Sequence, residues 1–284
     1  MRIALATAAR PFSAMANRCW PGLRILMYHR VAESHEFDQL VVSPERFAVQ
    51  MKALAAGHHV VTLAEGLRAL RAADVKGPMV AVTFDDGYLD NLEQAAPILL
   101  RYGIPATLFV STQFCDQSAV HPRYATSHRK ASEARMHLDW DQVRAFADLP
   151  GMEIGSHTVS HPYLQRLPDA RAREEIFDSR SRIELQLGKP VRYFCYPSGD
   201  FGLRELRLVR DARYEGAVTV APGRNLPGAD PWQLRRTEIT ERDDEQAFAL
   251  KLSGAFDAMH GLLHLRRQRR FAREAAQSRN RSKP

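Results

Sequence analysis

Short apolar runs alternate with longer amphipathic segments along most of the chain. The runs are rich in β-branched or aromatic residues, which is typical of strands, and they cover residues 23–28, 79–84, 106–110, 152–155 and 191–196. The longer segments predict helices over 44–56, 88–102 and 170–187. Ser43 stands where an N-cap belongs, and Gly103 and Gly188 stand where the second and third helices should end. This alternation predicts parallel βαβ units and an α/β fold.

Each predicted strand runs directly into polar residues. In chain order these are His29, then Asp85 and Asp86, then Ser111 and Thr112, then Ser156 and His157, and finally Ser198. In a parallel α/β fold the C-terminal strand ends share one rim, and functional groups collect there. The pattern therefore predicts that several of these side chains lie close together.

Length and composition favour one domain over two. A chain of 284 residues with 45% apolar content can bury one substantial core. We expect an N-terminal extension over 1–22, which is either a weak signal or a peripheral segment, a domain over 23–245, and a terminal helix over 246–265. A disordered basic tail over 266–284 follows, and residues 117–137 read as an inserted loop over the strand ends.

The net charge of +7 is concentrated in the tail. Residues 266–284 hold eight arginines or lysines against one glutamate, so the rest of the chain is neutral. This distribution argues against nucleic-acid binding, and it leaves either a solubilising tail or peripheral contact with an anionic membrane. No apolar run is long enough to span a bilayer as a helix. A cytoplasmic or membrane-peripheral location is favoured, and a periplasmic or secreted one remains open. The oligomeric state is not predicted.

Asp85 and Asp86 are the first candidates for chemistry. They follow an apolar strand and precede Gly87, so two acids stand side by side at a buried strand end. Burying adjacent carboxylates is costly unless a cation or hydrogen bonds compensate, and a metal ion is the simplest compensation. The alternative is an Asp-Asp-Gly turn that only caps the next helix.

His157 and His161 are the second candidates. Their spacing of four would place both imidazoles on one side of a helical turn. Two neutral imidazoles and one carboxylate make the three-ligand set of hydrolytic zinc sites, which leaves a position for water. The alternative is a pair of surface or core histidines. His260 and His264 share the spacing without an acid at a strand end, so we assign them a structural role.

Two further strand ends could contribute. His29 ends the first predicted strand, where it could protonate a leaving amine or simply tie down the first loop. The segment from Tyr196 through Pro197 to Asp200 forms a turn that could present a backbone amide to an oxyanion, although turn formation alone would also explain it.

Taken in order, these motifs resemble the polysaccharide deacetylase family, carbohydrate esterase family 4, also called the NodB homology domain. Thr83-Phe84-Asp85-Asp86-Gly87 is similar to its first motif, and the segment from Ser156 to Pro162 is similar to its second. The resemblance implies a distorted (β/α) barrel of about seven parallel strands. It also implies a divalent metal, usually zinc, held by Asp86, His157 and His161, with Asp85 as general base and metal-bound water as nucleophile. A backbone amide at Tyr196 would stabilise the oxyanion.

The chain departs from the family pattern in two places. Cys195 stands where an arginine usually precedes the third motif's proline turn, so the group that tunes Asp85 must come from elsewhere, and we name Arg235 or Arg236. No late Leu-x-x-His motif follows at the expected distance. Both departures resemble the branch of poly-N-acetylglucosamine deacetylases, in which the N-terminal strand supplies the acid histidine. That resemblance implies His29 as general acid.

The substrate-side residues are the least specified. Tyr196 and Pro197 of the third motif, Trp232 of a weak fourth motif and Arg236 are named for oxyanion or substrate binding. The function implied is hydrolytic removal of N-acetyl groups from an amino sugar in a polysaccharide or a lipid-linked glycan. Two alternatives remain: a non-catalytic glycan-binding relative, and a deacylase of a small amino compound.

Overall fold

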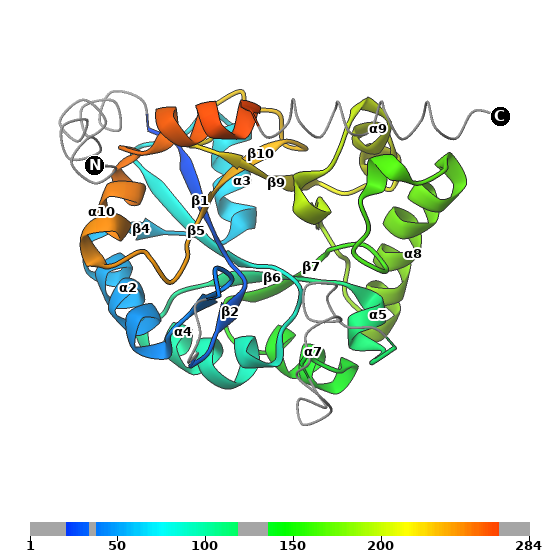
Figure 1. The fold of residues 1–284 in the computed structure, drawn as a ribbon, viewed down its shortest axis with the longest axis horizontal. Coiled ribbons are helices and arrows are strands. Elements are labelled where there is room, and N and C mark those ends of the chain that lie inside the picture. Colours follow the sequence, from blue (N-terminus) through cyan, green and yellow to red (C-terminus); the bar gives the residue numbers. More distant parts are fainter. Residues whose placement is uncertain (1–20, 34–37, 119–135, 267–284) are drawn as a thin grey trace.

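A ring of parallel strands forms the centre of the computed structural model, which describes residues 21–33, 38–118 and 136–266 (Figure 1). Seven strands close into a barrel in the order β1, β10, β9, β8, β7, β6, β5, and β5 pairs back to β1. Their bounds are β1 Leu23–Tyr28, β5 Met79–Phe84, β6 Ala106–Val110, β7 Met152–Ser156, β8 Tyr193–Cys195, β9 Gly216–Pro222 and β10 Leu234–Glu238. The predicted (β/α) barrel of about seven parallel strands is confirmed.

Three short strands lie outside the ring. β4 (His59–Val60) pairs with Met79 and Val80 at the start of β5. From Val82 onward, β5 pairs with β6 instead. β2 (Arg30–Val31) and β3 (Val41–Val42) form a separate parallel pair just after β1. This pair follows His29 directly, so it fixes the backbone on the C-terminal rim of the barrel.

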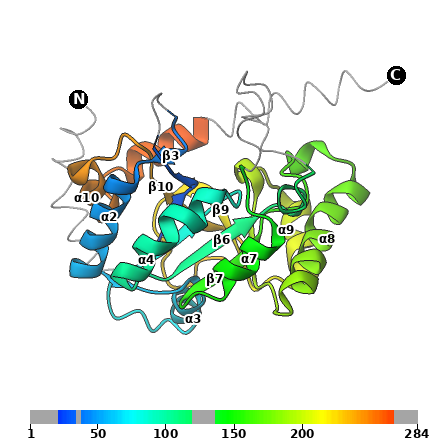
Figure 2. The ribbon, with the colours of Figure 1, turned by 90° about the horizontal axis from the view of Figure 1, so that it is seen from below.

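Helices surround the barrel. They are α2 Pro44–Gly57, α3 Leu63–Arg71, α4 Ala96–Tyr102, α5 Thr112–Cys115, α7 Trp140–Ala147, α8 Asp169–Leu187, α9 Leu203–Asp211 and α10 Glu245–Ser253. Figure 2 shows α2 beside α10 at one end and α8 beside α9 at the other. Ser43 caps α2 by accepting the Arg46 amide, and Gly103 and Gly188 end α4 and α8 at φ of 62° and 63°. Within the described residues, no helix is both long and apolar enough to cross a bilayer.

Two helices differ from the predictions. A π-helical turn over Asn91–Ala95 precedes α4 inside the predicted 88–102 helix. The predicted terminal helix over 246–265 is broken, because Gly254 takes a left-handed φ of 82° that ends α10, and a second helical segment covers 257–266. The extension over 1–20, most of the 117–137 loop and the tail from 267 lie outside the described residues.

Strand alternation divides the core into an inner and an outer layer. Inside the ring, apolar side chains from several strands pack around Phe109, including Ile25, Ala81, Val218 and Leu234. Gly155 leaves room for the Phe109 ring, since a Cβ there would lie 2.4 Å from it. Successive residues of a strand face opposite sides, so the inward rows continue upward to Asp85, His157, Cys195 and Arg236. The barrel interior therefore ends in the chemically capable residues.

Candidate active site

Asp85 and Asp86 leave β5 in different directions. The Asp85 amide donates to the Tyr28 carbonyl across β1 at 3.0 Å, so Asp85 continues the strand and its carboxylate faces the barrel interior. Asp86 then adopts φ of 72° and Gly87 φ of 65°, which turns the chain sharply. A side chain at Gly87 would meet Val110 at 2.9 Å. The turn therefore points two adjacent acids at different partners, Asp85 at Arg236 and Asp86 at the two histidines.

Arg236 holds Asp85 by a two-pronged ion pair. Its Nη1 and Nη2 donate to the two Asp85 carboxylate oxygens at 2.7 Å each, and its Nε donates to the Thr219 carbonyl at 2.9 Å. Arg236 is 1% exposed. Burial alone would raise the pKa of Asp85, but the Arg236 guanidinium lowers that pKa below its ordinary value. Of the two arginines considered from the sequence, Arg236 is therefore the one at Asp85, and Nε, Nη1 and Nη2 of its guanidinium are all engaged by protein groups.

Asp86, His157 and His161 converge on one point. Asp86 Oδ1 lies 3.5 Å from His157 Nε2 and 3.4 Å from His161 Nε2, and all ligand atoms of this group lie within 4.8 Å of one another. Tetrahedral bonds of about 2.0–2.1 Å would place neighbouring ligand atoms about 3.3–3.4 Å apart. One carboxylate and two imidazoles at this spacing fit a divalent metal such as zinc.

The described residues offer a second group of possible ligands beside the first. Asp85, His157 and Cys195 also lie within 4.8 Å of one another. Both Asp85 oxygens are engaged by Arg236, however, and burial raises the pKa of the Cys195 thiol well above its ordinary value. A protonated thiol and a paired carboxylate are poor metal ligands. The Asp86 group is therefore the better metal site.

The loop that carries both histidines is not the helical turn that their spacing suggested. After β7 the chain bends, with φ of 71° at Thr158 and 58° at His161, and the two rings meet edge to face at 4.7 Å. A β-branched residue such as Thr158 rarely adopts a positive φ. The histidines thus converge because the loop is strained and held, not because a helix aligns them.

Glu175 on α8 holds this loop from behind. Its Oε2 accepts the amides of Val159 and Ser160 at 2.9 Å each, and its Oε1 accepts the Ser160 hydroxyl at 2.6 Å. The residue is 3% exposed. Three hydrogen bonds to one buried carboxylate stabilise a loop whose backbone is otherwise unfavourable. Sequence reasoning missed Glu175, because only the spacing of buried positions along α8 indicates that this glutamate faces inward.

Backbone contacts orient His157. Its Nδ1 lies 2.8 Å from the Cys195 carbonyl oxygen, so Nδ1 carries the proton and the lone pair of Nε2 faces Asp86. Burial and, to a lesser extent, the neighbouring His161 lower the pKa of His157 to about 4, although Asp85 and Asp86 act in the opposite direction. His157 is therefore neutral near pH 7, as a metal ligand must be.

His29 stands at the rim beside this group. It follows β1, is half-buried, and its carbonyl accepts the Asn91 side-chain amide at 2.8 Å. Its charge is among those that lower the pKa of Asp85, after the larger effects of Arg236 and His157. Tyr28 pairs with Phe84, and its carbonyl accepts the Asp85 amide at 3.0 Å, so the next residue, His29, follows β1 beside Asp85.

The third-motif residues lie differently from the expectation. The Tyr196 amide donates to the Val218 carbonyl at 3.2 Å as an extension of the β8 and β9 pairing, so the prediction that it serves an oxyanion is wrong. The Tyr196 ring is buried and its hydroxyl donates to the Trp232 carbonyl at 3.2 Å. Pro197 has no amide hydrogen and is buried. The Trp232 indole donates to the Tyr214 carbonyl at 2.9 Å. These contacts are structural.

His137 is a second residue that sequence reasoning missed. Its Nδ1 lies 3.0 Å from the Asp86 carbonyl oxygen, and its ring is stacked between Tyr88 and Phe114 at 4.7 and 4.4 Å. It stands just past the part of the 117–137 loop that is not described. Nothing in the residue pattern distinguishes this histidine from a loop residue. Its ring lies directly beneath the turn that aims Asp86.

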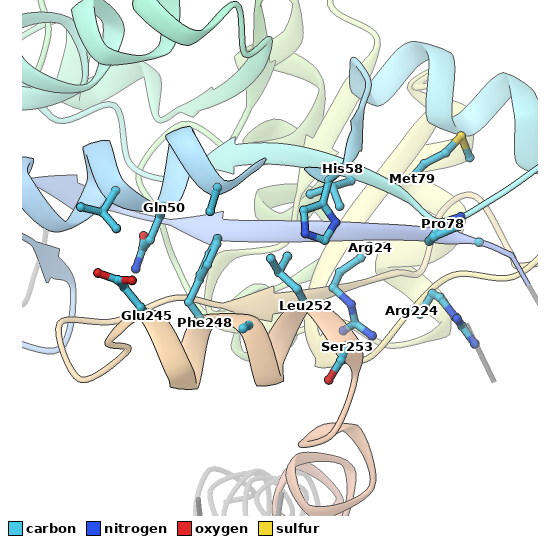
Figure 3. A pocket seen from close by; sticks show the side chains of 15 residues that line it. Arg24, Gln50, His58, Pro78, Met79, Arg224, Glu245, Phe248, Leu252 and Ser253 are labelled. Atoms are coloured by element: carbon cyan, nitrogen blue, oxygen red, sulfur yellow. The ribbon is translucent and has the colours of Figure 1, made fainter. Parts of the chain in front are cut away.

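A cavity of about 540 Å³ lies away from these residues (Figure 3). It is bounded by α2, α10 and the N-terminal ends of β1 and β5, and Phe248, Leu252 and Met79 contribute apolar walls. The converging carboxylates and histidines stand at the opposite, C-terminal ends of the strands. This cavity is therefore not the candidate active site.

Comparison with known proteins identifies the family of this chain. The family model for polysaccharide deacetylase matches residues 72–217. A Bacillus subtilis (strain 168) protein named as a polysaccharide deacetylase, YxkH, is 28% identical over 230 residues, which are 80% of this chain and 74% of the relative. IcaB from Ammonifex degensii is 26% identical with a TM-score of 0.69, covering 82% of this chain and 97% of that one. The Streptococcus pyogenes deacetylase PplD, solved with acetate, shares the fold at 23% identity and a TM-score of 0.71, covering 82% and 99%. The chain belongs to the polysaccharide deacetylase family.

Proposed function

We propose that this chain is a zinc-dependent hydrolase that removes N-acetyl groups from amino sugars in a polysaccharide or a lipid-linked glycan. The observation that carries the proposal is the pairing of two sites on one turn: Asp86 with His157 and His161, and Asp85 with Arg236. The family is one of carbohydrate deacetylases that are generally metal-dependent. A metal-ligand set next to an ionised, fixed carboxylate is what amide hydrolysis needs.

Asp86, His157 and His161 would hold the metal. They supply three ligands and so leave a position open. When bound, the ion supplies Lewis-acid polarisation of the acetamide carbonyl and lowers the pKa of water. The hydrogen bond from His157 Nδ1 to the Cys195 carbonyl keeps the ring in the orientation that this role requires.

Asp85 is the general base in this proposal. The Arg236 ion pair keeps the carboxylate ionised and immobile inside the rim. Each carboxylate oxygen retains a further lone pair beyond the one that faces Arg236, so Asp85 can still accept a proton from water. Arg236 acts through Asp85 and is a positioning residue. Cys195 stands where the family usually has an arginine, and Arg236 supplies the guanidinium that Cys195 cannot.

His29 is the general acid in this proposal. Acyl transfer from an amine needs a proton donor on the departing nitrogen, because an unprotonated sugar amine is a poor leaving group. His29 enters the rim from β1, beside Asp85, and its carbonyl is fixed by Asn91. Base and acid would thus come from neighbouring, paired strands, β5 and β1.

Acetate release from N-acetylglucosamine oligomers tests the proposal. The zinc-loaded wild type should release acetate, and Asp85→Asn should lower kcat by about a thousandfold or more while leaving the metal content at about one per chain. His29→Gln should lower kcat with little change in KM. His260→Asn, at a histidine outside the candidate site, should leave both constants unchanged.

Two outcomes would contradict it. A zinc-loaded wild type that binds these oligomers but releases no acetate is a glycan-binding protein. Equal turnover in the wild type and Asp85→Asn would remove Asp85 from the role of base.

A further inference from the structure

The last described segment of the chain, residues 257–266, has two different faces. Ala258, Leu262 and Leu265 are exposed, and the accessible fractions of the two leucines are 54% and 52%. Spacings of four and three residues put them on one side of a helix. The other side, with His260, Leu263 and His264, lines a cavity of about 630 Å³ against β9 and β10. One face is therefore turned toward the barrel, with Leu263 at its margin still 44% exposed, and the opposite face lies in solvent.

Buried contacts fix the direction of this segment. Arg24 on β1 is 3% exposed and donates from Nη1 and Nη2 to the Asp257 carboxylate at 3.0 and 2.9 Å. Phe256 is buried, and its ring stacks on His260 at 5.3 Å. Gly254 allows the bend before the segment, because a Cβ there would lie 2.8 Å from Arg24 and 2.9 Å from Asp257. The face formed by Ala258, Leu262 and Leu265 is thus a fixed part of the surface.

Positive charge continues from this face. Arg266 is exposed, and the sequence after it adds seven more basic residues and one glutamate, while the rest of the chain is neutral. An apolar face beside concentrated arginines matches the acyl boundary and anionic headgroups of a bilayer. Exposed leucines would contribute nothing to binding the phosphate backbone of a nucleic acid. A second copy docked on this face would bring two strongly basic tails together.

We propose that the face of Ala258, Leu262 and Leu265, together with Arg266, docks the protein on an anionic lipid surface, to which the basic sequence after Arg266 adds charge attraction. The inner side of this segment lines a cavity that Arg236 also lines. The Arg236 guanidinium is 2.7 Å from Asp85. A bilayer against the outer side would therefore be separated from this cavity by the width of one helix. A membrane-borne glycan is the substrate class that this placement favours. The substrate class rests on the proposed function, whereas the docking does not.

Vesicle flotation with the purified full chain tests the docking. Vesicles of phosphatidylcholine with about 30% phosphatidylglycerol should bind the wild type, and vesicles of phosphatidylcholine alone should bind it at least tenfold more weakly. Raising the salt concentration should weaken binding to the anionic vesicles. Asp85→Asn should bind like the wild type, so a failure of the deacetylase proposal leaves this test unaffected.

Two variants separate the apolar and the cationic parts. The double variant L262S/L265S should lower the vesicle partition coefficient roughly tenfold or more, because two leucines no longer enter the acyl boundary. Leu185 and Leu203 are more exposed, at 75% and 83%, but lie on α8 and α9, so L185S/L203S is the matched control and should bind like the wild type. The triple variant R269Q/R270Q/R273Q removes three of the positive charges that follow the segment in the sequence and should lose about a hundredfold in binding to anionic vesicles.

Three results would overturn the proposal. The first is equal flotation with anionic and neutral vesicles, or none with either. The second is loss of binding in the arginine variant but not in L262S/L265S, which would leave the apolar face without a role. The third is a wild-type dimer that L262S/L265S converts to a monomer in size-exclusion chromatography, because a second copy would then cover the face.

Discussion

Two histidine pairs of identical spacing stand in different surroundings. His157 and His161 lie in a strained loop after β7, and both Nε2 atoms face Asp86 at 3.5 and 3.4 Å. His260 and His264 lie on the terminal helical segment, where they line a cavity beside Lys251 and Met259. Within the described residues only the first pair belongs to a group of three possible ligands. The difference therefore lies in the backbone and the neighbours of each pair, not in the spacing.

Three features distinguish the first pair. A carboxylate lies between the rings, a backbone carbonyl fixes the tautomer of His157, and Glu175 holds the loop by three hydrogen bonds. At the second pair the Phe256 ring stacks on His260 at 5.3 Å. Spacing alone therefore does not make a metal site, because the ligands must also be fixed and neutral and must face a shared carboxylate.

Removing one histidine from each pair should give the largest contrast. His161→Gln should weaken zinc binding on the order of a thousandfold, more than the 10–100-fold typical of losing a partner behind a ligand. His264→Gln should change it by less than about twofold. Competition with a chromophoric chelator measures both affinities, and equal losses in the two variants would contradict the distinction drawn between the pairs.

Acid should destabilise the metal-free protein through His157. In the unfolded chain this histidine takes a proton below its ordinary pKa of about 6.5, whereas burial lowers its pKa to about 4 in the folded state. Between those two values the unfolded state binds more protons, so the free energy of unfolding falls as the pH falls. The contribution is up to about 3 kcal/mol.

Urea unfolding in EDTA at pH about 6.5 and about 4.5 measures this slope. His157→Asn should flatten it, because asparagine can keep a donor toward the Cys195 carbonyl without titrating. His260→Asn should flatten it less, since burial lowers the pKa of His260 from the same ordinary value but less strongly. A slope that is unchanged in His157→Asn would remove His157 as its source.

Glu175→Gln should give the smallest effect. A glutamine offers one acceptor oxygen where three donors meet, so the loop loses part of its support and zinc affinity should fall 10–100-fold. Glu184 on the same helix binds Arg180 and the Val191 amide, away from the histidines. Glu184→Gln is the matched control and should leave the affinity unchanged. If Glu175 had only a structural role, both variants would lose thermal stability and neither would lose zinc affinity.

Much of the fold follows from local patterns in the sequence. The apolar runs and the caps at Ser43, Gly103 and Gly188 are local signals, and the structure confirms the strands and helices built from them. Asp85, Asp86 and His157 could be named because they directly follow strands. The break at Gly254 was missed, because an isolated glycine is tolerated in a helix and only the contact of Arg24 with Asp257 makes it obligatory.

The support of the site could not be predicted from the sequence. Thr158 adopts a backbone conformation against its own preference, so no propensity points to the loop geometry. Arg236 and Glu175 act through contacts with residues far away in the chain, and a buried arginine or glutamate is unusual without its partner. Arg236 was one of two arginines considered, and Tyr196 was assigned an amide role that the pairing of β8 with β9 rules out.

The closure of the barrel has a consequence for how the protein is made. Of the seven strands of the ring, β1 is the first to leave the ribosome, yet it pairs with β10, and Arg24 on β1 bonds to Thr237 across 213 residues. Asp85 likewise can form its ion pair only after Arg236, 151 residues later, has been synthesised. Such long-range closure is slow, since loop entropy is lost before contacts form. Until β10 is synthesised, the nascent chain must carry an unpaired Asp85 and an open edge on β1, which is the stage at which a chaperone would have most to protect.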